Sequence, residues 1–107
     1  MINLDLKIEI AGTEYKFGKL LRVKEQKYNK INAQIEKSED DDKNYELMRD
    51  TLVELYGNQF TAQDIDDNLE TFEVLGAWMD ILIYKQAKAN EYVESRKKLF
   101  TQSKRKK

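Results

Sequence analysis

Five residues beginning at Asp64, Asp-Ile-Asp-Asp-Asn, place carboxylates at the spacing that opens a calcium-binding EF-hand loop. Such a loop needs glycine at its sixth position and a bidentate glutamate at its twelfth, where this chain has Leu69 and Leu75. A second acidic run, at 40–44, fails at the same two positions. We therefore interpret these acids as helix caps and solvated surface, and we predict no metal site.

The side chains that most often perform covalent or metal chemistry are missing. The chain of 107 residues has no cysteine and no histidine, which removes disulfides, thiol nucleophiles, imidazole bases and the usual zinc ligands. No pair of carboxylates lies in an apolar stretch that would raise one pKa for acid–base catalysis. The glycines form neither a phosphate-binding loop nor a dinucleotide fingerprint. We predict a protein that is not an enzyme and that needs no cofactor.

The balance of charge gives little support to a nucleic-acid-binding protein. Lysine and arginine number 19 against 20 aspartates and glutamates, so the whole molecule has no strong field that would attract a polyanion. Bases do gather after the last acid, Glu94, in the run from Arg96 to Lys107. That end could hold phosphates, and a small adaptor that binds nucleic acid through it is the alternative function. A solvated chain end is the simpler interpretation of the same bases.

The length and composition favour one small helical domain. A chain of this size forms a single modest core, which we place in residues 1–100. Proline is absent and glycine is scarce, so we expect a mainly α fold. The apolar runs are too short and too charged to cross a bilayer, and the start of the chain lacks the continuous apolar run of a secretory signal. We expect a cytoplasmic protein.

The segment 2–17 predicts a β-hairpin. Apolar and polar residues alternate from Ile2 to Ile10, which is the period of a strand with one buried face. The turn is expected at 11–13, and the alternation returns at Tyr15 and Phe17. Because an isolated hairpin is marginal in water, its apolar face must lie on the helices or pair with another subunit.

Four helices are expected at about 23–37, 43–57, 61–67 and 69–100, followed by a disordered basic tail at 101–107. Gly57 and Asn58 suit the left-handed conformation that ends many helices. Thr61 and Asp64 have the spacing of a shortened capping box at the start of the third helix. The last helix would be about 45 Å long at 1.5 Å per residue, so its second half should project from the core.

The core is expected between the second and the last of these helices. Apolar side chains at helical spacing are Tyr45, Met48, Leu52 and Leu55 in the former, and Leu69, Phe72, Leu75, Trp78, Met79, Leu82 and Ile83 in the latter. A further apolar stripe nearer the carboxyl end has no visible core to cover it, so partner binding and harmless exposure both stay open. The residues expected to contact a partner are Tyr84, Tyr92, Val93, Arg96, Leu99 and Phe100.

The order of these features resembles the tail assembly chaperones of long-tailed phages and prophages. A short hairpin of the form LxIxGxEYxF corresponds to residues 6–17, with Ala11 standing before Gly12. Polar helices follow, then the segment LVELYGNQFT at 52–61, an acidic helix and an apolar helix. The GNQFT stretch with its following acids is the most specific part of the resemblance, which covers about residues 4–90.

The resemblance implies a non-catalytic helical protein of the host cytoplasm that is absent from the finished particle. It would bind the tape measure protein and recruit tail tube subunits while the tail polymerises, and it could form homo-oligomers. In many members translational frameshifting adds an extension that contacts the tube protein. The physical pattern agrees with this role, because an exposed amphipathic helix can cover the apolar stripes of a long helical partner.

Overall fold

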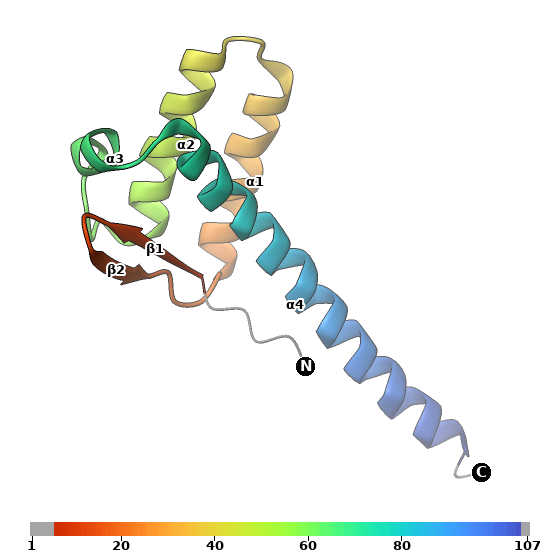
Figure 1. The fold of residues 1–107 in the computed structure, drawn as a ribbon. Helices are drawn as coiled ribbons and strands as arrows, with labels where there is room; N and C mark the ends of the chain where they lie inside the picture. Colours follow the sequence, from red (N-terminus) through yellow and green to blue (C-terminus); the bar gives the residue numbers. More distant parts are fainter. Residues whose placement is uncertain (1–5, 106–107) are drawn as a thin grey trace.

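The computed structural model describes residues 6–105, with side chains described as far as Lys97. The elements in chain order are β1 (Lys7–Ile10), β2 (Thr13–Lys16), α1 (Arg22–Lys37), α2 (Asp41–Leu55), α3 (Ala62–Asn68) and α4 (Thr71–Arg105). The predicted fold class, mainly α with an N-terminal β-hairpin and a long C-terminal helix, is confirmed. Figure 1 shows α1 and α2 running antiparallel, with α4 passing beside them and leaving the body of the domain.

The hairpin closes through a tight turn of two residues. Ile10 pairs with Thr13 in the antiparallel register, and between them Ala11 and Gly12 have φ angles of 52° and 82°. Two successive residues with positive φ produce the turn whose twist matches that of the flanking strands. Glycine adopts this conformation without cost, whereas the Cβ of alanine is strained by it.

Replacing Ala11 with asparagine is expected to stabilise the protein, because asparagine tolerates the left-handed conformation that alanine resists. The gain should be about 1 kcal/mol in the free energy of unfolding, which corresponds to a rise of roughly 4–8 °C in Tm for a domain near this size. Thermal unfolding followed by circular dichroism measures it. Ala33→Asn, at an exposed site within α1, is the control and should lower Tm, since asparagine disfavours helix interiors. A lower Tm for Ala11→Asn would contradict the prediction.

The apolar face of the hairpin lies on the helices of its own chain. Leu6, Ile8 and Ile10 are buried, and the residues between them are exposed. These three side chains join one core cluster with residues from all four helices. Ile2 and Leu4, which were predicted to extend the first strand, lie outside the described residues.

The ends of α2 and α3 follow from local side-chain chemistry. Asp40 caps α2 by accepting a hydrogen bond from the Lys43 amide at 3.1 Å, so α2 begins two residues before the expected position. Thr61 and Asp64 form the predicted capping box, with the Asp64 amide 3.1 Å from Thr61 Oγ1 and the Thr61 amide 2.9 Å from Asp64 Oδ2. Gly57, with a φ of 74°, lies in the left-handed region after α2, as predicted.

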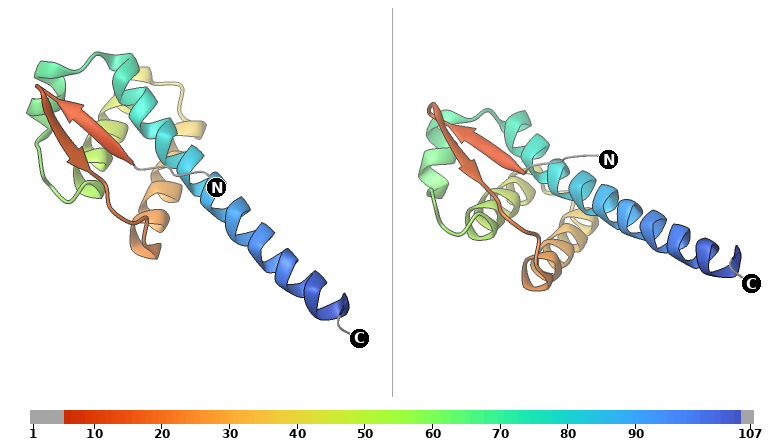
Figure 2. Two further views of the ribbon diagram at one scale, coloured as in Figure 1. Left: turned by 60° about the horizontal axis from the view of Figure 1, so that its bottom comes forward. Right: turned by 90° about the horizontal axis from the view of Figure 1, so that it is seen from below.

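The last helix is longer than the body of the domain requires. α4 is helical as far as Arg105, where the sequence analysis expected a disordered tail from residue 101. Neither proline nor glycine follows Gly76, and lysine, arginine and glutamine favour helix, so no residue stops it. The molecule measures 61 × 33 × 22 Å, and the views in Figure 2 show the second half of α4 extending beyond the other elements. Residues 106 and 107 lie outside the described part.

A pair of aromatic rings joins α1 to α4 at the centre of the core. The rings of Tyr28 and Trp78 lie 4.5 Å apart between centroids, and both side chains are at most 2% exposed. The Tyr28 hydroxyl donates to the carbonyl oxygen of Trp78 at 3.1 Å, and Trp78 Nε1 donates to Asn32 Oδ1 at 3.0 Å. These contacts determine which face of α4 turns toward the core.

The buried tyrosine makes stability depend on pH in the alkaline range. Burial, with a smaller contribution from the Glu36 charge, raises the pKa of Tyr28 to about 12. The unfolded chain releases this proton from pH 10 upward while the folded chain retains it, so stability present below pH 10 is lost as the pH rises toward 12. The loss is about 1.4 kcal/mol per pH unit for one such group.

Tyr28→Phe is therefore expected to flatten the dependence of stability on pH above 10. Urea unfolding at pH 8, 10 and 11 measures the slope for the variant and the parent. Part of the slope should remain, because burial and the Asp80 charge also raise the pKa of Tyr56. The same slope in the variant and the parent would contradict the assignment to Tyr28.

The core face of α4 agrees only in part with the predicted one: Trp78 is buried, as predicted, and Leu82 packs against the core. The buried residues of its first half are Val74, Ala77, Trp78 and Ile81. Phe72, Leu75, Met79 and Ile83 were predicted to be core residues, and this was wrong, because they are 65%, 42%, 49% and 51% exposed. Both faces of this helix carry apolar residues at helical spacing, so periodicity alone cannot choose between them. The packing of Trp78 against α1 makes the choice.

Candidate functional site

The acidic residues around α3 have structural partners. Asp64 belongs to the capping box, and the Asp67 carboxylate accepts from Gln63 Nε2 at 2.8 Å. Asp66 accepts from the Tyr45 hydroxyl and from Arg49 Nη1, each at 2.8 Å, which joins α3 to α2. Within the described part of the chain, no group of three or more acidic side chains is placed to hold a metal ion.

The most distinctive surface is a row of large apolar side chains on α4, called here the α4 stripe: Phe72, Leu75, Met79 and Ile83. Steps of three and four residues place these side chains on one helical face. Met79 and Ile81 are two positions, about 200°, apart around the helix, so the stripe points away from the buried face. A cluster of exposed apolar residues of this kind is typical of a protein-binding surface.

The α4 stripe has an acidic border. Glu73 and Asp80 are both exposed, and their spacing of seven residues puts them in a row beside the stripe. Val93 is 47% exposed and lies fourteen positions after Met79, which places it on the same face of the helix as the stripe. The polar residue Gln86 lies between them on this face and interrupts the apolar surface. Among the described helices none, α4 included, is long and apolar enough to cross a membrane.

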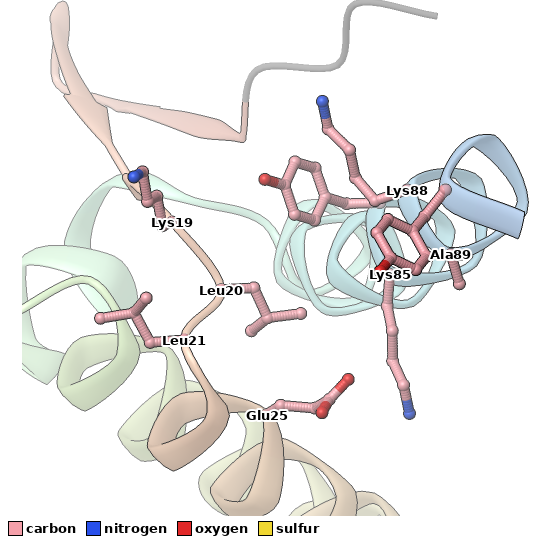
Figure 3. Close-up of a pocket in the computed structure, with 9 residues that line it drawn as sticks. Lys19, Leu20, Leu21, Glu25, Lys85, Lys88 and Ala89 are labelled. Carbon is pink, nitrogen blue, oxygen red and sulfur yellow. The ribbon is translucent and has the colours of Figure 1, made fainter. Parts of the chain in front are cut away.

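A second surface lies on the opposite side of α4 and is called here the basic groove. It is an open cavity of about 530 Å³ between the connection from β2 to α1 and the middle of α4 (Figure 3). Its apolar lining residues are Leu20, Leu21, Tyr84, Ala89 and Tyr92. Its charged lining residues are Lys19, Glu25, Lys85 and Lys88. The groove therefore combines apolar surface with an excess of positive charge.

Of the residues predicted to contact a partner, Tyr84 and Tyr92 lie together in the basic groove, and Val93 lies on another face of α4. Tyr84, which is half-buried, and Tyr92, which is 65% exposed, both line the basic groove. Arg96 is exposed, with its guanidinium carbon 5.9 Å from the Tyr92 ring centroid. Val93 follows the α4 stripe on another face. The side chains of Leu99 and Phe100 lie outside the described residues.

The sequence did not predict the α4 stripe as a surface, and it did not predict the wall of the basic groove that Leu20 and Leu21 form. Leu20 and Leu21 lie in a connection with no helical or strand periodicity, so no local signal placed them against α4. The stripe residues were visible as apolar positions but were assigned to the core. A usable signal was present, because the apolar positions of α4 between Phe72 and Ile83 are too many for a single face.

The alternative interpretation, nucleic acid binding, depends on bases at the end of the chain. From Lys98 onward their side chains lie outside the described residues. The positive charges that the structure does describe on α4 include Lys85 and Lys88, which border apolar surface in the groove. Apolar side chains thus separate these charges, whereas binding to nucleic acid gains most from many lysines or arginines that each neutralise a phosphate.

The comparisons with known proteins give one result. A family model described as "Phage tail chaperone protein" matches residues 1–105. No curated protein and no solved structure matches the chain.

Proposed function

The chain belongs to the phage tail chaperone family, and from this premise we propose that it is a non-catalytic tail assembly chaperone that binds the tape measure protein. In this role it acts in the host cytoplasm and is left out of the mature virion. It also recruits tail tube subunits to the tape measure protein as the tail grows. Each of these partners is a protein, so the site to identify is a protein-binding surface.

The observation that carries the proposal is the α4 stripe. Its four large side chains are between 42% and 65% exposed, on a helix whose opposite face is buried in its first half. From Phe72 to Ile83 the stripe covers about 16 Å at 1.5 Å per residue, or three helical turns. A stripe of this length is suited to pack against one amphipathic segment of a partner helix.

Such packing would explain the chaperone activity in physical terms. A long helical tape measure protein with apolar stripes is prone to aggregate before the tube surrounds it. The α4 stripe would cover part of that apolar surface by helix-to-helix contact, and the burial would be the main favourable term. The acidic border of Glu73 and Asp80 would favour partner segments that carry lysine or arginine beside their apolar residues.

Co-expression with the tape measure protein of the same phage tests the proposal. The tagged chaperone should increase the soluble fraction of the tape measure protein and co-purify with it. Adding the tail tube protein to the purified pair should then give a ternary complex on size-exclusion chromatography. Unchanged solubility of the tape measure protein, together with no co-purification, would contradict the proposed function.

A further inference from the structure

We propose that the basic groove is a second protein-binding site, distinct from the α4 stripe, and that it binds an acidic peptide segment with an apolar or aromatic anchor residue. The proposal goes beyond the binding of the tape measure protein, because it concerns the opposite face of α4 and a ligand of opposite charge preference. It rests on the shape of the groove, its apolar lining and its charge.

The groove has the size and the surface to accept an anchor side chain. Its volume of about 530 Å³ lies within the range of protein cavities that bind ligands. Leu21 and Tyr92 are 60% and 65% exposed at its rim, and Figure 3 shows Leu20 pointing into the space between the connection and α4. Two segments far apart in the sequence, 19–25 and 84–92, form its walls.

The charge of the groove selects an acidic ligand. Three lysines line it against a single carboxylate, that of Glu25. Among the described residues, none of the ion pairs includes Lys19, Lys85 or Lys88. Lys85 Nζ donates to Asn29 Oδ1 at 2.9 Å, and Lys88 Nζ lies 5.7 Å from the Tyr84 ring centroid. Lys85 and Lys88 are thus held beside the apolar lining, and with Lys19 they would meet the carboxylates of a bound segment.

A peptide fits this surface better than a nucleic acid. A polyanion binds through a row of phosphates and gains most from a continuous basic track. Here the lysines are interspersed with aliphatic and tyrosine side chains and do not form a continuous basic track. An acidic segment with one large apolar residue could satisfy both the lysines and the lining at once.

The test uses the full chain, labelled with ¹⁵N, and a synthetic peptide in which glutamates alternate with leucines around a central phenylalanine. Amide shifts should move at 19–25 and 84–92. A matched peptide with lysine in place of glutamate should bind about tenfold more weakly or worse. Lys19→Glu/Lys88→Glu should weaken binding of the acidic peptide by about tenfold. The control Lys30→Glu/Lys43→Glu makes the same charge change at exposed sites outside the groove and should have a much smaller effect.

Several outcomes would overturn the proposal. These are no binding, shifts that centre on the α4 stripe, equal affinity for the two peptides, or equal effects of the two double variants. Tighter binding of a single-stranded oligonucleotide of matched charge would assign the groove to nucleic acid. Self-association that Lys19→Glu/Lys88→Glu abolishes, seen by analytical ultracentrifugation, would assign it to a second copy.

The peptide-binding test of the basic groove gives a result that does not depend on whether the protein binds the tape measure protein. Met79→Glu/Ile83→Glu alters the α4 stripe on the opposite face and should leave peptide binding unchanged. Failure of the groove proposal with retained tape measure binding, or the reverse, can therefore be distinguished.

Discussion

Replacing Trp78 with alanine is expected to lower the free energy of unfolding by about 3–5 kcal/mol. The indole is 2% exposed, it packs on Tyr28 with 4.5 Å between ring centroids, and it donates to Asn32 at 3.0 Å. The variant loses the buried apolar area, leaves a cavity and leaves Asn32 Oδ1 without its donor. Because domains of this size have a total stability of about 5–15 kcal/mol, the variant should be unfolded by much less urea.

Urea unfolding followed by circular dichroism measures this effect, since the variant lacks the only tryptophan of the chain. Phe72→Ala is the matched control, because it truncates an aromatic side chain of the same helix that is 65% exposed. Its effect should be within about 0.5 kcal/mol. Equal losses for the two variants, or a loss below about 1 kcal/mol for Trp78→Ala, would contradict the assigned orientation of α4.

The double variant Met79→Glu/Ile83→Glu is expected to lose co-purification of the tape measure protein while remaining folded. Truncating one anchor of a protein interface often costs about 2 kcal/mol, and tenfold in affinity corresponds to about 1.4 kcal/mol. Introducing two charges into the middle of the α4 stripe should therefore weaken binding by well over tenfold. Both side chains are about half exposed in the structure, so Tm should change little.

Quantitative pull-down from co-expressing cells, with Tm measured on the same preparations, tests this prediction. The control Gln26→Glu/Gln34→Glu adds the same two charges at exposed sites of α1 and should retain the tape measure protein. Retention by the α4 stripe variant at the level of the parent would show that the stripe does not bind it. A large drop in Tm would instead show that Met79 and Ile83 contribute to the core.

Local features of the fold were predicted well because short-range physics decides them. The alternation up to Ile10 predicted the first strand. The turn was predicted at 11–13, and the structure has it at Ala11 and Gly12, with Thr13 already in β2. The capping box of Thr61 and Asp64 depends on residues three positions apart. Each of these features involves neighbours in the chain, so their spacing contains the necessary information.

The buried face of α4 was predicted only in part, because its orientation depends on a distant partner. Trp78 was correctly predicted to be buried, but Phe72, Met79 and Ile83 were assigned to the core in place of Val74 and Ile81. Both sets of residues are apolar and lie at helical spacing. The hydrophobic effect depends on buried area and not on direction, so either set could have formed the core. The choice comes from shape and hydrogen bonding at α1, fifty positions earlier, where Tyr28 and Asn32 receive the indole.

From the amino-acid sequence alone followed the order of the elements, the capping box, the lack of histidine and cysteine chemistry, and the family resemblance, whereas the start of α2 and the end of α4 did not. Which face of the long helix stays exposed, and that Leu20 and Leu21 lie across the basic groove from Tyr84 and Tyr92, became clear from the packing of the whole chain. The physical reason is that secondary structure depends on residues within a few positions of one another. A surface for a partner depends on which apolar residues remain after the core has been filled, and that depends on how distant segments pack.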